Sequence, residues 1–533
     1  MDSTDWWSRL REQPRWLYAL LAVGAGLRLY GLGVESYWLD EVASIDLIAS
    51  RSLAEVLVEV PLTDRHPPLY YAILKLWTTL TGISEAVTRL PAAVFGIASL
   101  PLLYVVATRL YDRQVGLLAT ALFALSTFQL GHAQDTRMYS LLAFTTLLSF
   151  YWLLRLLDDW GRWNLAGYVL ATVLMGYTHA FGLFVVFAQT VYVGWAWWHD
   201  GAGAPQVDLR RWLGAQVAVG VALLPWVGVL SWQAFLTPGG AEGLGWIDAP
   251  TLSTLVRTPG RYLSSLYPLL GVAVLVLVGL CYFADRLLGD GPLVPRRTVS
   301  DGGIAPGPLL VAWVAVPVAV ALALSYLVTP IYVHRYTIGV AVGFYVALGG
   351  VVRAIDQPSL QTLAVVLLLM GVAVGLPGYY GADQNEQWRE VATYLDENGD
   401  GDDLVLLTDL SVRHPFEYYF SGSNETHTRV AVPDTLNESE IRDRVRGYDT
   451  VWFVASNSNA RNIAKFSRAF QPPYTLVESR NYRGISVIEF RNASTAERAT
   501  ATNASAAAND SANATTATPT PSPTPPATAS PGG

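Results

Sequence analysis

The feature that most constrains this sequence is a series of apolar runs, each long enough for a helix to cross a membrane. One crossing takes about 20 mostly apolar residues. Hydrophobic residues make up 52% of the chain and charged residues only 15%. The runs therefore predict a polytopic α-helical membrane protein with about 11 spans. The predicted spans lie near residues 17–34, 90–108, 114–132, 138–156, 164–181, 182–198, 212–230, 265–284, 308–328, 337–353 and 360–378.

The distribution of arginine predicts how these spans are oriented, because short cytoplasmic loops are enriched in Lys and Arg. With residues 1–16 in the cytoplasm, every short inner loop is basic. An odd number of spans then places everything after residue 378 outside the cell membrane. The inner-loop arginines are Arg109, Arg113, Arg155, Arg162, Arg210, Arg211, Arg286, Arg296, Arg297 and Arg353.

Residues 379–494 have the pattern of a small extracytoplasmic α/β domain. Short apolar runs near 404–407, 430–432 and 451–454 alternate with helical patterns, and strands near 474–480 and 484–490 follow. Residues 495–533 are rich in Thr, Ala, Ser and Pro, too polar to form a core, and predict a disordered tail. Asn-x-Ser/Thr sequons, candidates for glycosylation of an outer surface, occur at Asn424, Asn437, Asn492, Asn503, Asn509 and Asn513.

The first outer loop, 35–89, contains an acidic pair, Asp40 and Glu41, directly after Trp38 and the first span. Carboxylates at a membrane surface are costly to desolvate and serve as a base, a metal ligand or a cation site. The alternative is a solvated loop start or a helix N-cap. Helical patterns at 44–60 and 69–81 predict two helices lying on the membrane surface.

Two further outer loops place an arginine beside aromatic residues. Arg137 follows Asp135 in the second outer loop, and Arg335 lies between His334 and Tyr336 in a later one. A guanidinium has forked donors that suit a phosphate. The alternatives are an Asp135–Arg137 pair in the first case and an interfacial anchor in the second.

The histidines and the single cysteine do not predict a metal site. His66 shares the first outer loop with Asp40, which favours a place in the site. His179, near the outer end of a predicted span, has the alternative reading of a buried hydrogen-bonded residue. Cys281 is alone, so a two-cysteine metal site is excluded.

A first span followed by WLDE, RHPPLYY, RLPAAVFG, QDTRMYSLL and YVHRY resembles the membrane glycosyltransferases of the GT-C type. The pattern covers residues 17–355 and is most similar to glycosyltransferase family 39, with the protein O-mannosyltransferases and lipid A aminoarabinose transferases. The resemblance implies that Asp40 is the catalytic base with Glu41 beside it, and that Arg137 and Arg335 hold the donor phosphate. His334 departs from the proline more usual there. Residues predicted to line the substrate pocket are His66, Tyr70, Asp135, Tyr139, His179, His334 and Tyr336.

The predicted activity is transfer of a sugar from a polyprenyl (dolichyl)-phosphate donor to a hydroxyl of a glycan, glycoprotein or glycolipid on the outer face. The reaction is expected to invert the anomeric centre and to need neither a metal nor a cofactor, with a hexose such as mannose as the sugar. A net charge of -8 argues against nucleic acid as a partner. The alternatives are a multispan transporter or flippase, a surface receptor, and an oligosaccharyltransferase, whose Trp-Trp-Asp motif is absent from 379–494.

Overall fold

The computed structural model consists of two compact units, Met1–Asn385 and Glu386–Gly533. The structure describes residues 15–64, 66–199, 206–235, 247–264, 304–407, 410–420, 428–431, 437–456 and 460–493.

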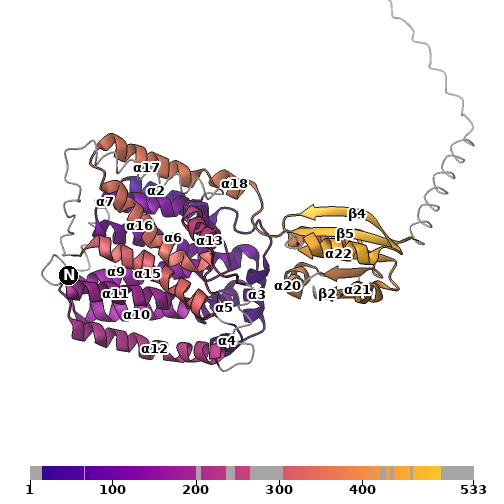
Figure 1. Cartoon of the computed structure of the whole chain (residues 1–533), viewed down its shortest axis with the longest axis horizontal. Helices are drawn as coiled ribbons and strands as arrows, with labels where there is room; N and C mark the ends of the chain where they lie inside the picture. Colours follow the sequence, from indigo (N-terminus) through magenta and orange to yellow (C-terminus); the bar gives the residue numbers. More distant parts are fainter. Residues whose placement is uncertain are drawn as a thin grey trace, which may run out of the picture. The chain divides into compact units, whose positions relative to one another are not determined.

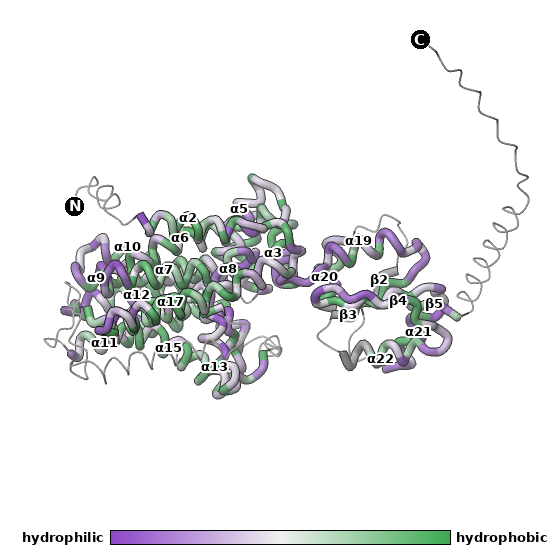
Figure 2. Tube along the Cα trace, turned by 90° about the horizontal axis from the view of Figure 1, so that it is seen from above, coloured by the Kyte–Doolittle hydropathy of each residue, from purple (hydrophilic) through white to green (hydrophobic). Residues whose placement is uncertain are grey.

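The first unit is a bundle of helices whose long members lie side by side, with α3, α4 and α5 together at one end (Figure 1). Figure 2 shows that α7, α15 and α17 are hydrophobic along most of their length. The helices are α2 (Arg15–Leu29), α3 (Leu39–Ala49), α4 (Leu53–Thr63), α5 (Leu69–Thr81), α6 (Glu85–Leu110), α7 (Arg113–Leu125), α8 (Thr127–Ala133), α9 (Tyr139–Asp158), α10 (Arg162–Thr178), α11 (Gly182–Trp198), α12 (Leu209–Phe235), α13 (Leu252–Tyr262), α15 (Pro306–Leu327), the 3-10 helix η2 (His334–Thr337), α16 (Ile338–Arg353), α17 (Pro358–Ala373) and α18 (Leu376–Gly381).

The number of helices that could cross a membrane is smaller than predicted. Among the described residues, 6 helices are long and apolar enough, and 7 if the bent pair α7 and α8 is one span. Helices α2, α10 and α11 have 15, 17 and 17 residues. At about 1.5 Å per residue they are shorter than a hydrocarbon core of about 30 Å. The predicted count of eleven is therefore not confirmed, and the predicted span 265–284 lies outside the described residues.

A bend of 62° separates α7 from α8. Ser126 starts α8 by accepting a hydrogen bond from the N–H of Gln129 (3.4 Å). The carbonyls that the break leaves free, those of Phe123 and Ala124, accept from the guanidinium of Arg28 at 3.1 and 3.3 Å. Arg28 is fully buried on α2. Backbone polar groups at membrane depth must be satisfied inside the protein, so Arg28 allows a broken helix here.

Residues 35–89, the predicted first outer loop, form three helices before α6, where the pattern predicted two. The predicted helix 69–81 is confirmed as α5, whereas the predicted helix 44–60 is wrong and is divided into α3 and α4. The division arises at Ser52, whose hydroxyl accepts from the N–H of Glu55, while the Glu55 carboxylate accepts from the N–H of Ser52 (2.6 Å). This capping box starts a new helix inside a continuous apolar pattern.

The second unit contains a five-stranded sheet of order β2-β1-β3-β5-β4. Strands β2, β1 and β3 pair in parallel, and β5 pairs antiparallel with both of its neighbours, β3 and β4. Along β1, Leu404 and Leu406 pack on one face with α21 and α22, and Val405 and Leu407 pack on the other with α19 and α20. This agrees with the strands that the sequence predicts. The elements are α19 (Trp388–Asn398), β1 (Leu404–Leu407), α20 (Leu410–Tyr419), β2 (Thr428–Ala431), α21 (Glu438–Val445), β3 (Thr450–Ser456), α22 (Ala460–Phe470), β4 (Tyr474–Tyr482) and β5 (Ile485–Asn492).

Two of the predicted glycosylation sites lie in described parts of this unit. Asn437 is the N-cap of α21 and accepts from the N–H of Glu440 (3.0 Å), and Asn492 ends β5. The predicted tail 495–533 and the candidates Asn424, Asn503, Asn509 and Asn513 lie outside the described residues.

Close packing of α15 against α16 depends on the absence of a side chain at Gly343. Trp313 stacks on Phe150 (ring centroids 3.6 Å apart) and donates its indole N–H to the carbonyl of Gly339 (2.9 Å), so it has little freedom to move. A Cβ at Gly343 would lie 2.8 Å from the indole of Trp313. We expect Gly343→Ala to lower the free energy of unfolding by about 1–3 kcal/mol, measured as a lower Tm in detergent.

The matched control for this variant is Gly220→Ala in α12, where nothing lies within 4 Å of the added Cβ. This change should be neutral or stabilise the helix by up to about 1 kcal/mol. Equal Tm values for the two variants would contradict the packing argument.

Candidate active site

A buried ion pair between Glu41 and Arg89 lies at the centre of the candidate site. Glu41, in the first turn of α3, is 0% exposed, and Arg89, near the start of α6, is 2% exposed. Nε of Arg89 lies 2.7 Å from Oε1 of Glu41, and Nη2 lies 2.7 Å from Oε2. This is the bidentate geometry of a strong pair. The other N–H groups of Arg89 donate to the carbonyls of Leu32, Glu35 and Ser36.

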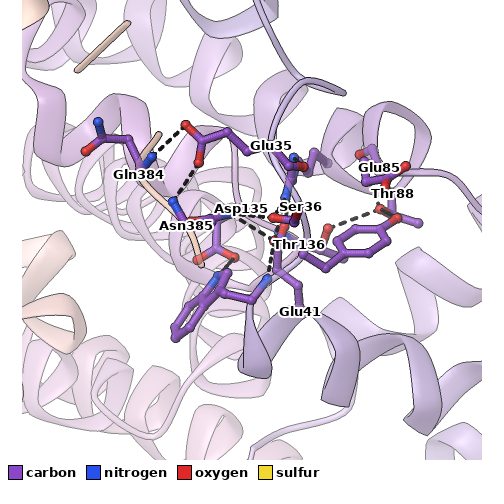
Figure 3. A network of polar contacts seen from close by, with 12 residues as sticks. Glu35, Ser36, Glu41, Glu85, Thr88, Asp135, Thr136, Gln384 and Asn385 are labelled. Atoms are coloured by element: carbon purple, nitrogen blue, oxygen red, sulfur yellow. Dashed lines mark hydrogen bonds and ion pairs between the residues drawn. The ribbon is translucent and has the colours of Figure 1, made fainter. Parts of the chain in front are cut away.

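The Glu41 carboxylate also joins two further segments of the chain (Figure 3). Oε1 accepts from the backbone N–H of Thr136 (2.9 Å), and Oε2 accepts from the side-chain amide of Asn385 (3.4 Å). One carboxylate on α3 therefore contacts α6, the segment between α8 and α9 and the residues that follow α18. Glu41 is placed to hold these segments together, since both of its oxygens are occupied.

Asp40 is the neighbour of Glu41 on α3, and its side chain points about 100° away from that of Glu41 around the helix axis. Its side chain is 25% exposed, which leaves it accessible to a substrate. Its Oδ2 lies 3.6 Å from Nη2 of Arg335, which belongs to η2. The guanidinium of Arg335 lies 5.8 Å from the ring centroids of Trp38 and Tyr336. Helix α3 and η2 thus bring a carboxylate and a cation from distant parts of the sequence together.

Arg137 follows α8 in the second outer loop and is 5% exposed. Its Nη1 donates to Ser44 Oγ (3.0 Å), to the hydroxyl of Tyr71 (3.3 Å) and to the backbone carbonyl of Asp40 (3.3 Å). Its Nε has no hydrogen-bond partner among the described residues. The expected alternative, a pair with Asp135, is not formed. A buried guanidinium with an unused N–H donor can bind a negatively charged ligand.

Asp64 connects His66 to Arg137. Its carboxylate lies 3.0 Å from Nδ1 of His66 and accepts from the hydroxyl of Tyr71 (2.8 Å), which in turn lies beside Arg137. Burial raises the pKa of Asp64, but His66, Arg137 and Tyr71 together lower it well below its usual value. Asp64 therefore stays ionised and orients His66 and Tyr71.

Aromatic rings from four segments surround the space near Arg335. The ring of His179 lies 4.7 Å from that of Tyr336, 5.7 Å from that of His66 and 6.1 Å from that of Tyr139. In the described part of the chain, Nε2 of His179 and the hydroxyl of Tyr139 have no hydrogen-bond partner. The structure thus places these four predicted pocket residues in one cluster with unused donors.

His334 and Tyr70 are also predicted to line the pocket, but their ring contacts are with residues outside this cluster. Nε2 of His334 lies 2.8 Å from Nη1 of Arg261, so the ring of His334 contacts α13. Tyr70 is fully buried with its ring 6.1 Å from that of Tyr71. Its hydroxyl has no partner among the residues that the structure covers.

Asp135 connects the second outer loop to Trp38. Its Oδ1 accepts from the indole N–H of Trp38 (3.1 Å), and its Oδ2 lies 3.9 Å from Nδ1 of His132. Burial raises the pKa of Asp135 to about 6, although Arg137 and the indole of Trp38 oppose the change. A pKa raised in this way is common among groups in functional sites.

Sequence analysis did not identify Arg89, Asp64 or Tyr71 as residues of the site. A detectable signal existed for Arg89, which is a charge close to an apolar run, where ionisable residues generally have a partner. Asp64 and Tyr71 lie in the polar and aromatic stretch of the first loop, but their pairing with Arg137 depends on tertiary structure. Within the described residues, no group of three or more His, Cys, Asp and Glu side chains is arranged to hold a metal ion.

Removing the charge of Glu41 should destabilise the protein. The variant Glu41→Gln leaves the Arg89 guanidinium buried without its counter-ion, which costs about 3–5 kcal/mol. We expect a clearly lower Tm in detergent. Glu59→Gln is the control, because the Arg51–Glu59 pair (3.4 Å) has a half-exposed carboxylate and contributes about 1 kcal/mol or less. A Tm for Glu41→Gln equal to that of Glu59→Gln would show that the buried pair is not a structural centre.

Stability should depend on pH through Asp135. Its pKa is about 6 in the folded protein, whereas the ordinary value for an aspartate is 3.8, so the folded state holds the proton more tightly between these values. Its contribution to stability is therefore largest below about pH 4 and falls as pH rises to about 6, by on the order of 3 kcal/mol. Asp135→Asn should flatten this part of the Tm–pH curve, and an unchanged curve would contradict the assignment.

Comparison with known proteins identifies one family model and several solved structures. The model for dolichyl-phosphate-mannose-protein mannosyltransferase matches residues 65–232. No curated protein matches the chain significantly.

Three of the solved structures that match are distant from this chain in sequence. ArnT from Cupriavidus metallidurans in the apo state is 14% identical, with 89% of this chain and 97% of that chain covered and a TM-score of 0.46. The oligosaccharyltransferase AglB from Archaeoglobus fulgidus is 13% identical, with coverages of 89% and 74% and a TM-score of 0.49. The Pmt1-Pmt2 complex of S. cerevisiae is 16% identical, with coverages of 45% and 36% and a TM-score of 0.33.

At these identities and TM-scores, the solved structures identify neither an activity nor a substrate. The family model is more informative, because residues 65–232 include both the His66–Tyr70 segment and the Asp135–Arg137 loop. The match confirms the resemblance that the motifs predict: the chain resembles the dolichyl-phosphate-mannose-protein mannosyltransferases, membrane glycosyltransferases of the GT-C type.

Proposed function

We propose that this protein transfers a sugar, a hexose such as mannose, from a polyprenyl (dolichyl)-phosphate donor to a hydroxyl of a glycan or protein acceptor. The observation that carries the proposal is the position of the accessible Asp40 carboxylate beside two cations, Arg335 at 3.6 Å and Arg137, whose Nε is unused within the described residues. A base next to an anion-binding pair is what transfer from a sugar phosphate requires.

The two guanidinium groups are proposed to bind the donor phosphate. Forked N–H donors suit phosphate oxygens, and burial of Arg137 strengthens its attraction for an anion. As the bond between the sugar and the phosphate breaks, negative charge increases on the phosphate that leaves with the lipid. Cations already in place stabilise that charge without having to reorganise. The arginines supply this positive charge, so we expect no obligatory metal and no cofactor.

Asp40 is proposed to be the base. Its carboxylate takes the proton of the acceptor hydroxyl while the hydroxyl oxygen forms a bond to the anomeric carbon, and the bond from that carbon to the phosphate breaks. Single displacement of this kind inverts the anomeric centre. Glu41 does not suit this role, because its two oxygens accept from Arg89, Thr136 and Asn385.

The proposed location is the cell membrane, with the N-terminus in the cytoplasm and the active site and the α/β unit outside. The support is the arginine pattern of the short loops and the absence of any nucleotide-sugar supply outside a cell, which makes a lipid-linked donor necessary. A transporter or flippase is less well supported, since the unusual charges lie near helix ends rather than at the middle of spans.

The proposal is tested by sugar transfer from labelled dolichyl-phosphate mannose and other polyprenyl-phosphate hexoses, with the full-length protein in lipid. Asp40→Asn should reduce the rate by about two orders of magnitude or more, and Arg137→Lys should also reduce it, because lysine lacks the forked donors. The control is Asp46→Asn, an exposed residue on the same helix α3, which should retain the wild-type rate.

Two results would contradict parts of this proposal. An absence of transfer from every lipid-linked donor would favour transport over catalysis. Loss of activity on chelation, with recovery on adding a divalent cation, would contradict the metal-independent mechanism.

A further inference from the structure

A small polar pocket lies beside Trp38, separate from the two arginines assigned to the donor phosphate. It has a volume of about 190 Å³ and is lined by residues of the first outer loop, α8, the second outer loop and the segment after α18. Trp38 contributes to its wall and also contacts Arg335, whose guanidinium lies 5.8 Å from the indole ring. The pocket therefore adjoins the candidate site through one aromatic side chain.

Hydrogen bonds connect the segments that line this pocket (Figure 3). Both oxygens of Glu35 accept hydrogen bonds, from the backbone N–H groups of Gln384 (2.9 Å) and Asn385 (2.8 Å). The amide of Asn385 donates to the carbonyl of Ser36 (3.0 Å). Among the other lining residues, the hydroxyl of Tyr379 donates to Oε1 of Gln134 (2.7 Å). These bonds hold the lining segments in place before any ligand arrives.

The charges of the pocket exclude a phosphate. Glu35 and Asp135 place two carboxylates in the wall, and both would repel an anion. The cation in the wall is Arg89, and its five N–H groups are already used by Glu41 and by backbone carbonyls. The pocket thus differs from the Arg137 and Arg335 pair, and it disfavours an anion.

The unused groups of the pocket are hydrogen-bond acceptors beside aromatic rings. Among the described residues, Oδ2 of Asp135 and Oδ1 of Asn385 accept no hydrogen bond, although Asp135 is only 7% exposed. The rings of Trp38 and Tyr379 lie in the same wall. Acceptors of this kind bind hydroxyl groups, and aromatic faces bind the C–H face of a sugar ring.

We propose that this pocket binds one sugar ring of the acceptor glycan. The inference rests on the proposed glycosyltransferase function, which it refines by naming a carbohydrate rather than an unmodified protein as the acceptor. A pocket of this size is smaller than the roughly 300–1,000 Å³ of sites for drug-sized ligands, so it accepts a single ring. Trp38, which lines the pocket, has its indole ring 5.8 Å from the guanidinium of Arg335.

Gly131 provides a way to close the pocket without disturbing its walls. Gly131, on α8, contributes to the lining, and a Cβ added there would have as its nearest neighbour Cε2 of Tyr379 at 3.9 Å, an ordinary contact. Gly131→Met therefore fills the pocket with a flexible side chain. Gly26→Met on α2 is the matched control, because nothing lies within 4 Å of a Cβ at Gly26.

The experiment measures binding of methyl α-mannoside, methyl α-glucoside and methyl α-galactoside to the full-length protein in lipid nanodiscs by saturation-transfer NMR. No donor is present, so sugar binding is measured independently of transfer. We expect at least one glycoside to bind wild type and Gly26→Met equally, and to bind Gly131→Met at least about tenfold more weakly. Absence of binding to wild type, or equal binding to Gly131→Met, would overturn the proposal.

A second arm distinguishes an acceptor sugar from the sugar of the donor. Binding of the methyl glycoside is measured again after saturation with dolichyl-phosphate mannose. Persistence of binding supports an acceptor subsite, whereas loss of binding would show that the donor's own sugar occupies the pocket and would overturn the assignment. Glycoside binding by a protein that transfers no sugar would separate failure of the proposed function from failure of this inference.

Discussion

The buried ion pair of Glu41 and Arg89 is the interaction on which the rest of the site depends. Two charges are removed from water almost completely, and this is tolerable because each is fully hydrogen-bonded. The pair connects α3 to α6, and the same carboxylate accepts hydrogen bonds from Thr136 and Asn385. Loss of one partner would leave the other charge uncompensated, so the pair stabilises one arrangement of these segments and disfavours others.

Neighbouring residues have different roles because of how a helix presents them. Successive side chains on a helix point about 100° apart, so Glu41 points into the protein while Asp40 remains a quarter exposed beside Arg335. The arginines divide in a similar way. All N–H groups of Arg89 are occupied inside the protein, whereas Arg137 keeps an unused Nε within the described residues. Hydrogen-bond occupancy, rather than charge alone, separates the structural groups from those available to a substrate.

Two sites of different chemistry adjoin Trp38. Arg137 and Arg335 form a positive site next to Asp40, and the pocket beside Trp38 has carboxylate and amide acceptors with aromatic walls. The second outer loop contributes to both, through Arg137 on one side and Asp135 on the other. That loop starts where α8 ends, so its position follows from the break after α7 that Arg28 stabilises. A fully buried arginine on the first helix thereby contributes to the geometry of the site.

The sequence by itself determined the helical character of the first unit, with its long apolar helices, and the alternation of strands and helices in 379–494. Hydrophobicity and its period are local properties of the chain, and α5 was predicted with its observed bounds. Tertiary structure decided the rest. The division of 44–60 depends on competition between the Ser52 capping box and one continuous helix. The pairing of Glu41 with Arg89 depends on contacts between distant residues. The same holds for the connection of Asp64 to Arg137 through Tyr71. Pairing across 48 residues leaves no periodic signal in a sequence, because its free energy arises only when the folded protein excludes water from both charges.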